Sequence, residues 1–186
     1  MGIASYLQQL WKKPKDHPLW KTRLMAYRRD PATLKVERPT RLDRARALGY
    51  TSKKGVFVVR QRVKRGGHTR QRTKGKRSKR QSIKLILQKN YQHIAEERAN
   101  KKFTNAEVLG SYWVAKDGKH VWYEVLLVDR DHPQVKADKS LSWVKAQRGR
   151  VYRGKTSAGR KSRALHRKGK GVEKARPSRR ANKRTL

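Results

Sequence analysis

The sequence has no cysteine, few acidic residues and no long hydrophobic run, and each of these absences excludes a class of protein. Without cysteine the chain forms no disulfide, uses no catalytic thiol and builds no thiolate zinc site. No apolar stretch approaches the roughly 18 residues that indicate a membrane-spanning helix. The first ten residues also lack the basic start and apolar centre of a secretory signal. We therefore expect an intracellular protein that is not anchored to a membrane.

The scarcity of acidic residues leaves a very large positive charge. The 186 residues include 52 Lys+Arg but only 13 Asp+Glu, which gives a net charge of +39. Hydrophobic residues make up 34% of the chain, below the roughly 45–50% of an ordinary globular domain, so the core is small. Unpaired positive charges repel one another in a compact state. The expected partner is therefore a polyanion, with nucleic acid as the first candidate and an anionic membrane surface as the second.

The charge is unevenly distributed along the chain. Residues 91–143 contain eight basic and eight acidic residues, residues 60–80 contain eleven basic residues and no acid, and residues 145–186 contain seventeen basic residues and one acid. Blocks of like charge favour extended segments, whereas the neutral part favours a folded core. We predict three regions: a basic helical N-terminal region that packs on the core (1–55), an α+β core with a basic loop at 66–80 (56–144), and a long extended basic tail (145–186).

Hydrophobic spacing predicts helices in the N-terminal region. The first helix contains Ile3, Leu7, Leu10 and Trp11 and ends at Pro14. The second contains Leu19, Leu24 and Tyr27 and ends at Asp30-Pro31. The third covers residues 41–48, with Thr40 as its N-cap and Gly49 as the residue that ends it. A strand then follows over residues 56–65. Its two faces are apolar (Phe57, Val59 and Val63) and basic (Arg60, Arg62 and Lys64). We predict that the apolar face packs on the core and that the basic face runs beside a nucleic-acid backbone.

The period changes to helical over residues 82–103, with Ser82 as the expected N-cap. Two strands, at residues 107–115 and 120–129, then flank Asp117-Gly118, which is a strong signal for a two-residue hairpin loop. This loop would place Trp113 opposite Trp122 and Tyr112 opposite Tyr123. We expect the helix to cover the more apolar face, which carries Val108, Tyr112, Val114, Val121, Tyr123, Val125 and Leu127. The other face, with Glu107, Ser111 and Glu124, is expected to be either less dry or covered by the N-terminal helices. The predicted fold class is α+β, with a small antiparallel sheet and helices packed on it.

Catalytic and metal-binding patterns have little support. His93, Glu96 and Glu97 lie close together on the predicted helix, and Asp129, Asp131 and His132 lie at the end of a strand. Either group resembles part of a metal site. The first is interpreted as polar residues on a helix surface, because too few further ligands are nearby, and the second as a polar turn closed by Pro133. The sequence has no G-x-S-x-G elbow and no nucleotide-binding fingerprint. We expect no enzyme activity, no cofactor and no small-molecule substrate.

The basic segments carry the stronger hypothesis. Lys and Arg that neutralise phosphates release counterions and so supply most of the affinity that does not depend on sequence. The residues predicted to bind RNA are Arg38, Arg41, Arg44, Arg46, Arg60, Arg62, Lys64, Arg65, Arg70, Arg72, Lys74, Lys76, Arg77, Arg80, Arg160, Lys161, Arg163, Arg167, Arg179 and Arg180. A neutral unit with several separate basic segments fits a folded RNA better than a uniform duplex. A DNA-compacting, chromatin-type protein is the alternative.

Seven motifs in order resemble a known family, the archaeal and eukaryotic (e-type) large-subunit ribosomal protein fifteen. They are YLQQLW (6–11), RPTR (38–41), ARALGY (45–50), RVKRGG (62–67), AEERA (95–99), VLGSYWV (108–114) and TSAGRKSR (156–163). The short C-terminal tail and the lack of cysteine are more similar to the archaeal form. The resemblance implies a structural, non-catalytic constituent of the large ribosomal subunit in the cytoplasm. The implied partners are 23S-type rRNA and neighbouring ribosomal proteins, with Mg²⁺ only as a counterion of the rRNA.

Overall fold

The computed structural model describes residues 2–67, 89–163 and 165–166. Within these residues one antiparallel sheet of four strands forms the centre of the fold, in the order β1-β2-β4-β3. The strands are β1 (Thr33–Val36), β2 (Val56–Lys64), β3 (Ala106–Lys116) and β4 (His120–Asp129). The predicted α+β class with a small antiparallel sheet is confirmed. The short strand β1, which pairs with β2, is not among the elements that the sequence predicts.

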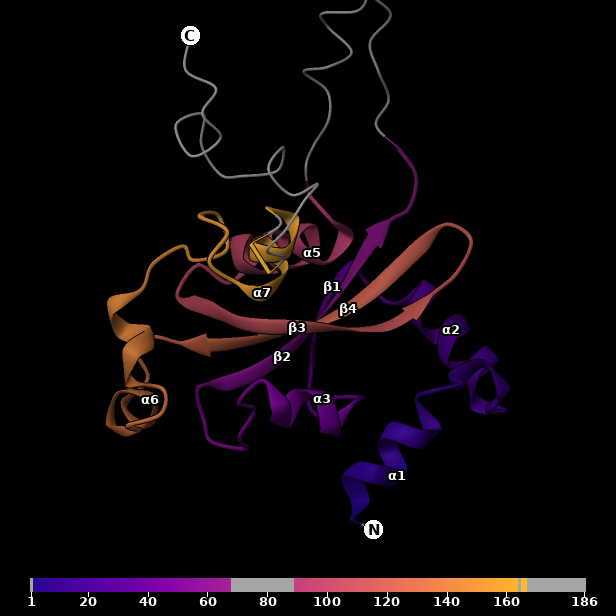
Figure 1. Cartoon of the computed structure of the whole chain (residues 1–186), viewed down its shortest axis with the longest axis horizontal. Coiled ribbons are helices and arrows are strands. Elements are labelled where there is room, and N and C mark those ends of the chain that lie inside the picture. Colours follow the sequence, from indigo (N-terminus) through magenta and orange to yellow (C-terminus); the bar gives the residue numbers. More distant parts are fainter. Residues whose placement is uncertain (1, 68–88, 164, 167–186) are drawn as a thin grey trace, which may run out of the picture.

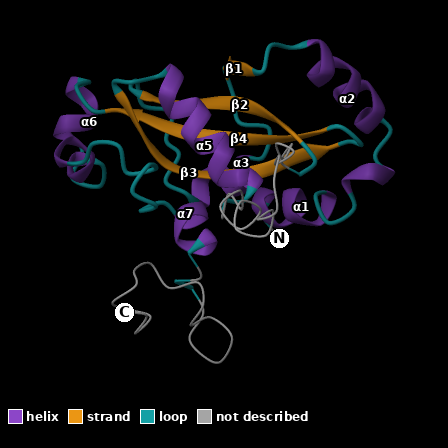
Figure 2. Cartoon of the chain, turned by 90° about the horizontal axis from the view of Figure 1, so that it is seen from above, coloured by secondary structure: helices purple, strands orange, loops and turns teal. Residues whose placement is uncertain are grey.

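Helices cover both faces of the sheet (Figure 1). The α-helices are α1 (Ile3–Leu10), α2 (Leu19–Arg29), α3 (Leu42–Ala47), α5 (Tyr91–Lys102), α6 (Pro133–Ala137) and α7 (Ser157–Ser162), and the 3-10 helices are η1 (Pro14–Asp16) and η2 (Ser142–Ala146). α5 crosses one face, while α2 and α6 lie at opposite ends of the sheet (Figure 2). In the described parts of the chain, none of the helices has the length and hydrophobicity needed to cross a membrane.

Small and branched side chains form the core beneath α5. Val59, Val125 and Leu127 of the sheet are fully buried against Ala95 and Ala99 of the helix. The alanines allow the helix to lie close to the sheet, because a methyl side chain adds little separation between the two layers. The predicted apolar face of residues 56–65, packed on the core, is therefore confirmed, and α5 also covers the part of the hairpin face that carries Val125 and Leu127, as predicted.

α5 starts later than the helix predicted over residues 82–103. Asn90 is its N-cap, with an extended backbone and a side-chain oxygen that accepts a hydrogen bond from the backbone N–H of His93 at 2.7 Å. Because a capping residue has non-helical backbone angles, one continuous helix from Ser82 is wrong. Residues 82–88 lie outside the described residues.

The N-terminal helices cover the opposite face of the sheet, which is one of the two possibilities that the sequence leaves open. Trp11, Trp20 and Tyr27 are buried in a cluster with Trp122 of β4. The rings of Trp20 and Trp113 are stacked, with their centroids 6.1 Å apart. The elements α6 and η2, which the sequence does not predict, pack on the other end of this face.

α1 contributes less to the core than its hydrophobic spacing predicts. Ile3 and Leu10 remain 76% and 47% exposed, and Trp11, directly after the helix, is the residue that enters the core. The predicted stop of α3 at Gly49 is confirmed, since its φ of +93° is a conformation that favours glycine. The predicted N-cap at Thr40 is wrong, because α3 starts one residue later and its N-cap position makes no side-chain hydrogen bond.

The β3–β4 hairpin is confirmed, but its register differs from the prediction towards the turn. Pairs at the open end follow the expected register, and two irregularities in β3 then shift the partners. Tyr112 consequently pairs with Glu124, and Trp113 pairs with Tyr123. A bulge adds an unpaired residue and turns the following side chains to the other face. Tyr112 and Val114 therefore pack with the N-terminal helices and not beneath α5.

The centre of the hairpin turn moves by one residue for the same reason. The backbone N–H of Asp117 donates to the carbonyl of His120 at 2.9 Å, which leaves Gly118 and Lys119 as the central residues. The Asp117 carboxylate accepts hydrogen bonds from the backbone N–H groups of Lys119 and His120 at 2.8 and 2.5 Å. An aspartate that binds the backbone two residues ahead stabilises a turn locally.

Residues 145–163 pack on the core and do not form an extended tail. Val151 is fully buried in the cluster beneath α5. Gly154 and Gly159 meet backbone to backbone, since a Cβ on Gly159 would lie 2.6 Å from the Cα of Gly154. The prediction of an extended chain from residue 145 is therefore wrong as far as residue 163. Residues 167–186 lie outside the described residues.

Candidate nucleic-acid interface

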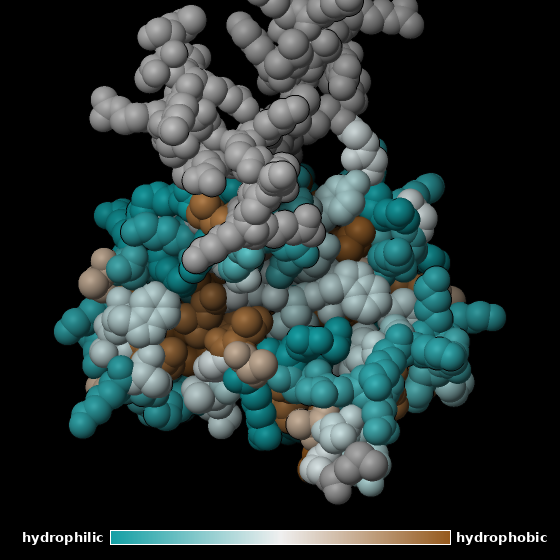
Figure 3. Space-filling model, viewed as in Figure 1, coloured by the Kyte–Doolittle hydropathy of each residue, from teal (hydrophilic) through white to brown (hydrophobic). Residues whose placement is uncertain are grey.

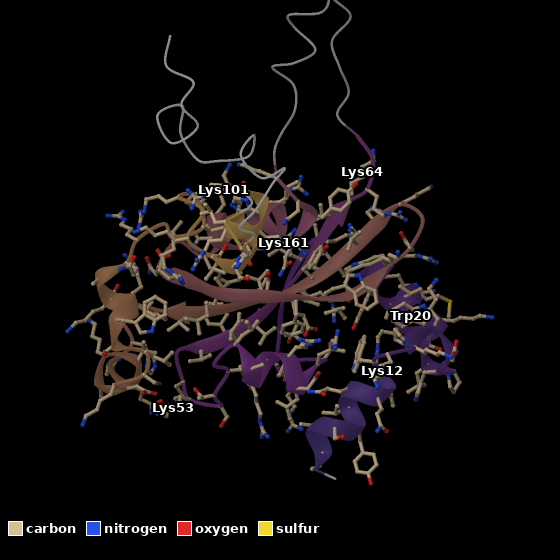
Figure 4. The ribbon with its side chains drawn as sticks, in the orientation of Figure 1. Lys12, Trp20, Lys53, Lys64, Lys101 and Lys161 are labelled. Carbon is tan, nitrogen blue, oxygen red and sulfur yellow. The ribbon has the colours of Figure 1, made fainter. Side chains whose placement is uncertain are left out.

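Cations of the predicted interface lie on both sides of the sheet. Figure 4 shows Lys64 and Lys161 above the sheet, and α3, which carries Arg44 and Arg46, lies below it in Figure 1. Hydrophilic residues form most of the coloured surface in Figure 3. The exposed members of the predicted set are Arg38, Arg44, Arg46, Lys64, Arg65, Arg160 and Lys161, and the half-buried ones are Arg41, Arg60, Arg62 and Arg163. The interface is therefore divided among several surfaces.

The other predicted residues lie outside the part of the chain that the structure describes. They are Arg70, Arg72, Lys74, Lys76, Arg77 and Arg80 of the basic loop, and Arg167, Arg179 and Arg180 near the C-terminus. Their role in RNA binding stays a prediction.

The first basic cluster surrounds α3, and we call Arg38, Arg44 and Arg46 the α3 surface. All three side chains are exposed. Arg41 lies behind them, with its guanidinium 4.7 Å from the ring centroid of Trp11. Burial lowers the pKa of Arg41, and the nearby Asp43 carboxylate, 3.6 Å from its Nη2, opposes this change. Arg41 is thus a fixed charge beside three mobile ones.

The basic face predicted on β2 is not an open row of cations. Arg60 donates to the Asp30 carboxylate at 2.6 Å, and its guanidinium lies 3.9 Å from the ring centroid of Tyr27. Arg62 donates to the backbone carbonyl of Arg28 at 2.8 Å. The expectation that three aligned side chains face a phosphate backbone is therefore wrong for the strand as a unit. α2 covers this face, and only Lys64 at the end of the strand is exposed.

The second basic cluster lies on α7, where Arg160 and Lys161 are exposed; we call these two residues the α7 surface. The hydroxyl of Thr156 caps α7 by accepting a hydrogen bond from the backbone N–H of Gly159 at 3.3 Å. Arg163 turns inward and donates to the carbonyl of Gly154 at 3.0 Å. Arg163 therefore closes the loop before α7, while the α7 surface faces solvent.

A buried glutamate fixes the segment that leads to the α3 surface. Glu124 of β4 is fully buried. Its carboxylate accepts hydrogen bonds from the backbone N–H and the hydroxyl of Thr40, at 2.9 and 2.5 Å, and from the hydroxyl of Tyr112 at 2.7 Å. Burial is the largest cause of the raised pKa of Tyr112, followed by the charge of Glu124. The chain between Arg38 and Arg41 is thereby tied to the centre of the sheet.

Two more buried glutamates hold the C-terminal segment. Glu107 accepts hydrogen bonds from the backbone N–H groups of Gly149 and Arg150, at 2.5 and 3.1 Å. Glu96 of α5 accepts hydrogen bonds from the hydroxyls of Ser111 and Thr156, at 2.5 and 2.6 Å. Thr156 therefore links α7 to α5. These buried carboxylates hold the C-terminal segment firmly, because breaking a hydrogen bond would leave a buried donor unpaired at a cost in free energy.

This role of the acidic residues does not follow from the sequence pattern. Its available signal is the placement of Glu107 and Glu124 inside two nearly continuous apolar strands. A buried charge requires hydrogen-bond partners, but those partners, such as Thr40 and Gly149, are too distant along the chain to be identified from the pattern.

Glu96 gives the fold a pH dependence that can be measured. Burial raises the pKa of Glu96, although the two hydroxyl hydrogen bonds oppose the rise. A raised folded-state pKa means that this group stabilises the fold most below its unfolded pKa, about 4.5, and that this contribution is lost as the pH rises through the folded-state pKa. We expect Glu96→Gln, which mimics the protonated form, to gain stability relative to wild type as the pH rises from about 4.5 to 8.

Urea denaturation at several pH values would measure this difference. The matched control is Glu97→Gln on the same helix, since Glu97 is only half-buried and bonds to Lys89 at 2.8 Å. A constant difference between Glu96→Gln and wild type over this pH range would contradict the expected titration.

The groups considered as metal sites have other partners, and the interpretation of His93 and Glu96 as surface residues of the helix is wrong, since both side chains are buried. Glu96 binds two hydroxyls as described above, and His93 Nε2 lies 3.0 Å from the carbonyl of Val151. His132 is the N-cap of α6, where its ring nitrogen accepts from the backbone N–H of Gln134. Within the described residues, no three His, Asp or Glu side chains gather as metal ligands would.

Comparisons with known proteins give one consistent result. A family model described as "Ribosomal L15" matches residues 2–182. The chain is 51% identical over 183 residues to the large ribosomal subunit protein eL15 of Methanocorpusculum labreanum, with 95% of this chain and 94% of the relative covered. It is 49% identical over 181 residues to the protein of the same name from Methanocella arvoryzae, with 94% and 92% covered. The match spans almost the whole chain, and the chain belongs to the Ribosomal L15 family, in its archaeal e-type form.

Proposed function

We propose that this chain is a structural constituent of the large ribosomal subunit in the cytoplasm, where it binds and stabilises folded large-subunit rRNA. The family and the names of both relatives support the ribosomal role. The observation that carries rRNA binding is the placement of exposed arginines and lysines on both sides of a sheet whose acidic residues are partly turned inward. The chain has no catalytic part in this function.

Binding proceeds by phosphate neutralisation at positions that the fold keeps fixed. The α3 and α7 surfaces are each tied to the sheet by a buried glutamate, Glu124 and Glu96 respectively. Arginine guanidinium groups bind phosphate oxygens in a bidentate manner. Such contacts position an RNA without reading its sequence. Because the two surfaces lie on different sides of the sheet, one molecule can bridge two rRNA segments.

The partners in this proposal are 23S-type rRNA and neighbouring large-subunit proteins. Mg²⁺ takes part only as a counterion of the rRNA, and no small molecule or membrane is involved. DNA compaction, the alternative that the charge alone allows, has no support from the family. The divided basic surface also fits a folded RNA with several crevices better than one face of a duplex.

Sedimentation of the tagged chain in an extract of archaeal cells tests the proposal. We expect the protein to migrate with the large subunit and to remain there at moderate salt. A double variant, Arg160→Gln with Lys161→Gln, should dissociate at lower salt, and Lys136→Gln with Lys139→Gln, on and just after α6, is the matched control. Migration with chromosomal DNA, or as free protein, would refute the proposal.

A further inference from the structure

A hollow of about 290 Å³ lies between α3 and β3. Its walls include Arg41, Arg44, Ala47 and Leu48 from the α3 side and Trp113 from β3. The volume is close to the lower end of the roughly 300–1,000 Å³ range in which proteins bind small organic groups.

The walls combine apolar surface with two positive charges. Ala47 and Leu48 offer aliphatic surface, and Trp113 is only partly buried. Leu48 is held in place by close contact with β3, since a Cβ on Gly110 would lie 3.1 Å from its Cδ2. The apolar part of the hollow is thus shaped by side chains that the fold positions.

The two arginines of the hollow differ in freedom. Arg41 is fixed by the Trp11 ring and donates to the carbonyl of Trp113 at 3.4 Å, while its buried Nε has no hydrogen-bond partner. The side chain of Arg44 is 61% exposed, and its Nε lies 4.0 Å from Asp43. The fixed charge of Arg41 and the exposed charge of Arg44 suit a ligand with a flat part that enters the hollow and an anionic group at one end.

We propose that this hollow binds one unpaired nucleotide of the rRNA, a site that rests on the proposed rRNA-binding function. The base packs against Leu48 and the part of Trp113 that lines the hollow, since the Trp113 ring is also stacked on Trp20. Arg44 pairs with the phosphate of the same nucleotide. Proteins recognise RNA mainly at unpaired nucleotides whose bases can be stacked on aromatic or guanidinium groups. Charge complementarity favours RNA over an apolar protein segment, because the two arginines share a single carboxylate, that of Asp43, and an apolar segment would leave one positive charge unbalanced.

The test fills the hollow without disturbing the core. Ala47 is exposed and is the last residue of α3, so Ala47→Trp should fold and occupy the space intended for a base. Ala137→Trp is the matched control, because Ala137 is the exposed last residue of α6. The probe is the large-subunit rRNA transcript of an archaeon, bound by the full chain and mapped with reagents that modify unpaired bases.

We expect Ala47→Trp to lower the affinity about 5- to 100-fold, the range that corresponds to the loss of one stacked base, and to expose one base that the wild type protects. The control should change the affinity less than twofold. A second variant, Arg44→Gln, should reduce the slope of log K against log salt by about one phosphate contact even if Ala47→Trp does not fold.

The outcomes separate the two proposals. If the wild type protects no part of the rRNA, the proposed function itself is wrong. If the wild type binds but Ala47→Trp has the same affinity and protections, the nucleotide site is wrong. If Ala47→Trp binds rRNA normally but fails to join the complete subunit, the hollow receives a protein side chain and the nucleotide site is again wrong.

Discussion

Glu124→Ala is expected to lower the free energy of unfolding by about 3–5 kcal/mol, because the change leaves one buried and two part-buried donors without an acceptor at about 1–3 kcal/mol each, partly relieved by relaxation. The donors are the backbone N–H and hydroxyl of Thr40 and the hydroxyl of Tyr112. Glu124 is fully buried, so water does not replace the carboxylate. Glu124→Gln keeps one acceptor, so its free energy of unfolding should lie between those of the wild type and Glu124→Ala.

Chemical denaturation at constant salt measures this loss, and Glu37→Ala is the matched control. Glu37 is exposed and lies three residues before Thr40, so the control removes the same charge from the neighbourhood of the same segment. Equal stability of the two variants would show that Glu124 does not hold the segment. Loss of RNA affinity with the control alone would show that the α3 surface is positioned in another way.

The affinity for rRNA is expected to fall about 10³- to 10⁵-fold between 50 and 200 mM salt, the range for roughly 6–10 phosphate contacts. The physical reason is the release of counterions from each neutralised phosphate. Each contact adds about −0.7 to −0.9 to the slope of log K against log salt concentration. The net charge of +39 and the exposed cations on both sides of the sheet provide enough groups. Filter binding or fluorescence anisotropy over a salt series measures the slope.

Variants make this prediction specific to residues. Replacing Arg160 and Lys161 by Gln should reduce the slope by about two contacts, because both side chains are exposed. Arg60→Gln should leave the slope unchanged, since Arg60 is paired with Asp30. A wild-type slope near −3 would mean that most of the charge stays solvated, and an effect of Arg60→Gln equal to that of the α7 variant would mean that the ion pair opens on binding.

Local patterns predicted most of the central elements correctly. Alternation in β2, helical spacing before β3 and the Asp117-Gly118 signal predicted a sheet with a hairpin and a covering helix, and these are present. Charge predicted a surface rich in exposed cations, which is present, whereas binding of a polyanion stays a prediction. These features depend on neighbouring residues, so a single sequence contains them.

The errors concern contacts between residues that are far apart in the sequence. The bulges in β3 that move Tyr112 to the other face are not visible in its alternation. Threonine is a residue type that often caps helices, but the hydroxyl of Thr40 donates its hydrogen bond to Glu124, 84 residues away. Arg60 has the pattern of an exposed cation, but α2 brings Asp30 to it.

The C-terminal segment was misjudged for a related reason. Between residues 145 and 163 the only bulky aliphatic residue is Val151, and a single apolar residue gives no periodicity. Its attachment depends instead on Glu96 and Glu107, whose backbone and hydroxyl partners carry no compositional signal. Sequence patterns reveal hydrophobic faces far better than they reveal a buried carboxylate whose hydrogen-bond donors are distant along the chain.

The buried glutamates Glu96 and Glu107 also determine the order in which parts of the chain fold during synthesis. Glu107 is translated 42 residues before Gly149, and Glu96 is translated 60 residues before Thr156. At about 5–20 residues per second these carboxylates wait roughly 2–12 s for their donors. The nascent chain therefore holds two buried acids without their C-terminal donors until its last quarter has been made. The α7 surface, through which we propose that the chain binds rRNA, is consequently fixed to the core only after Thr156 has been added.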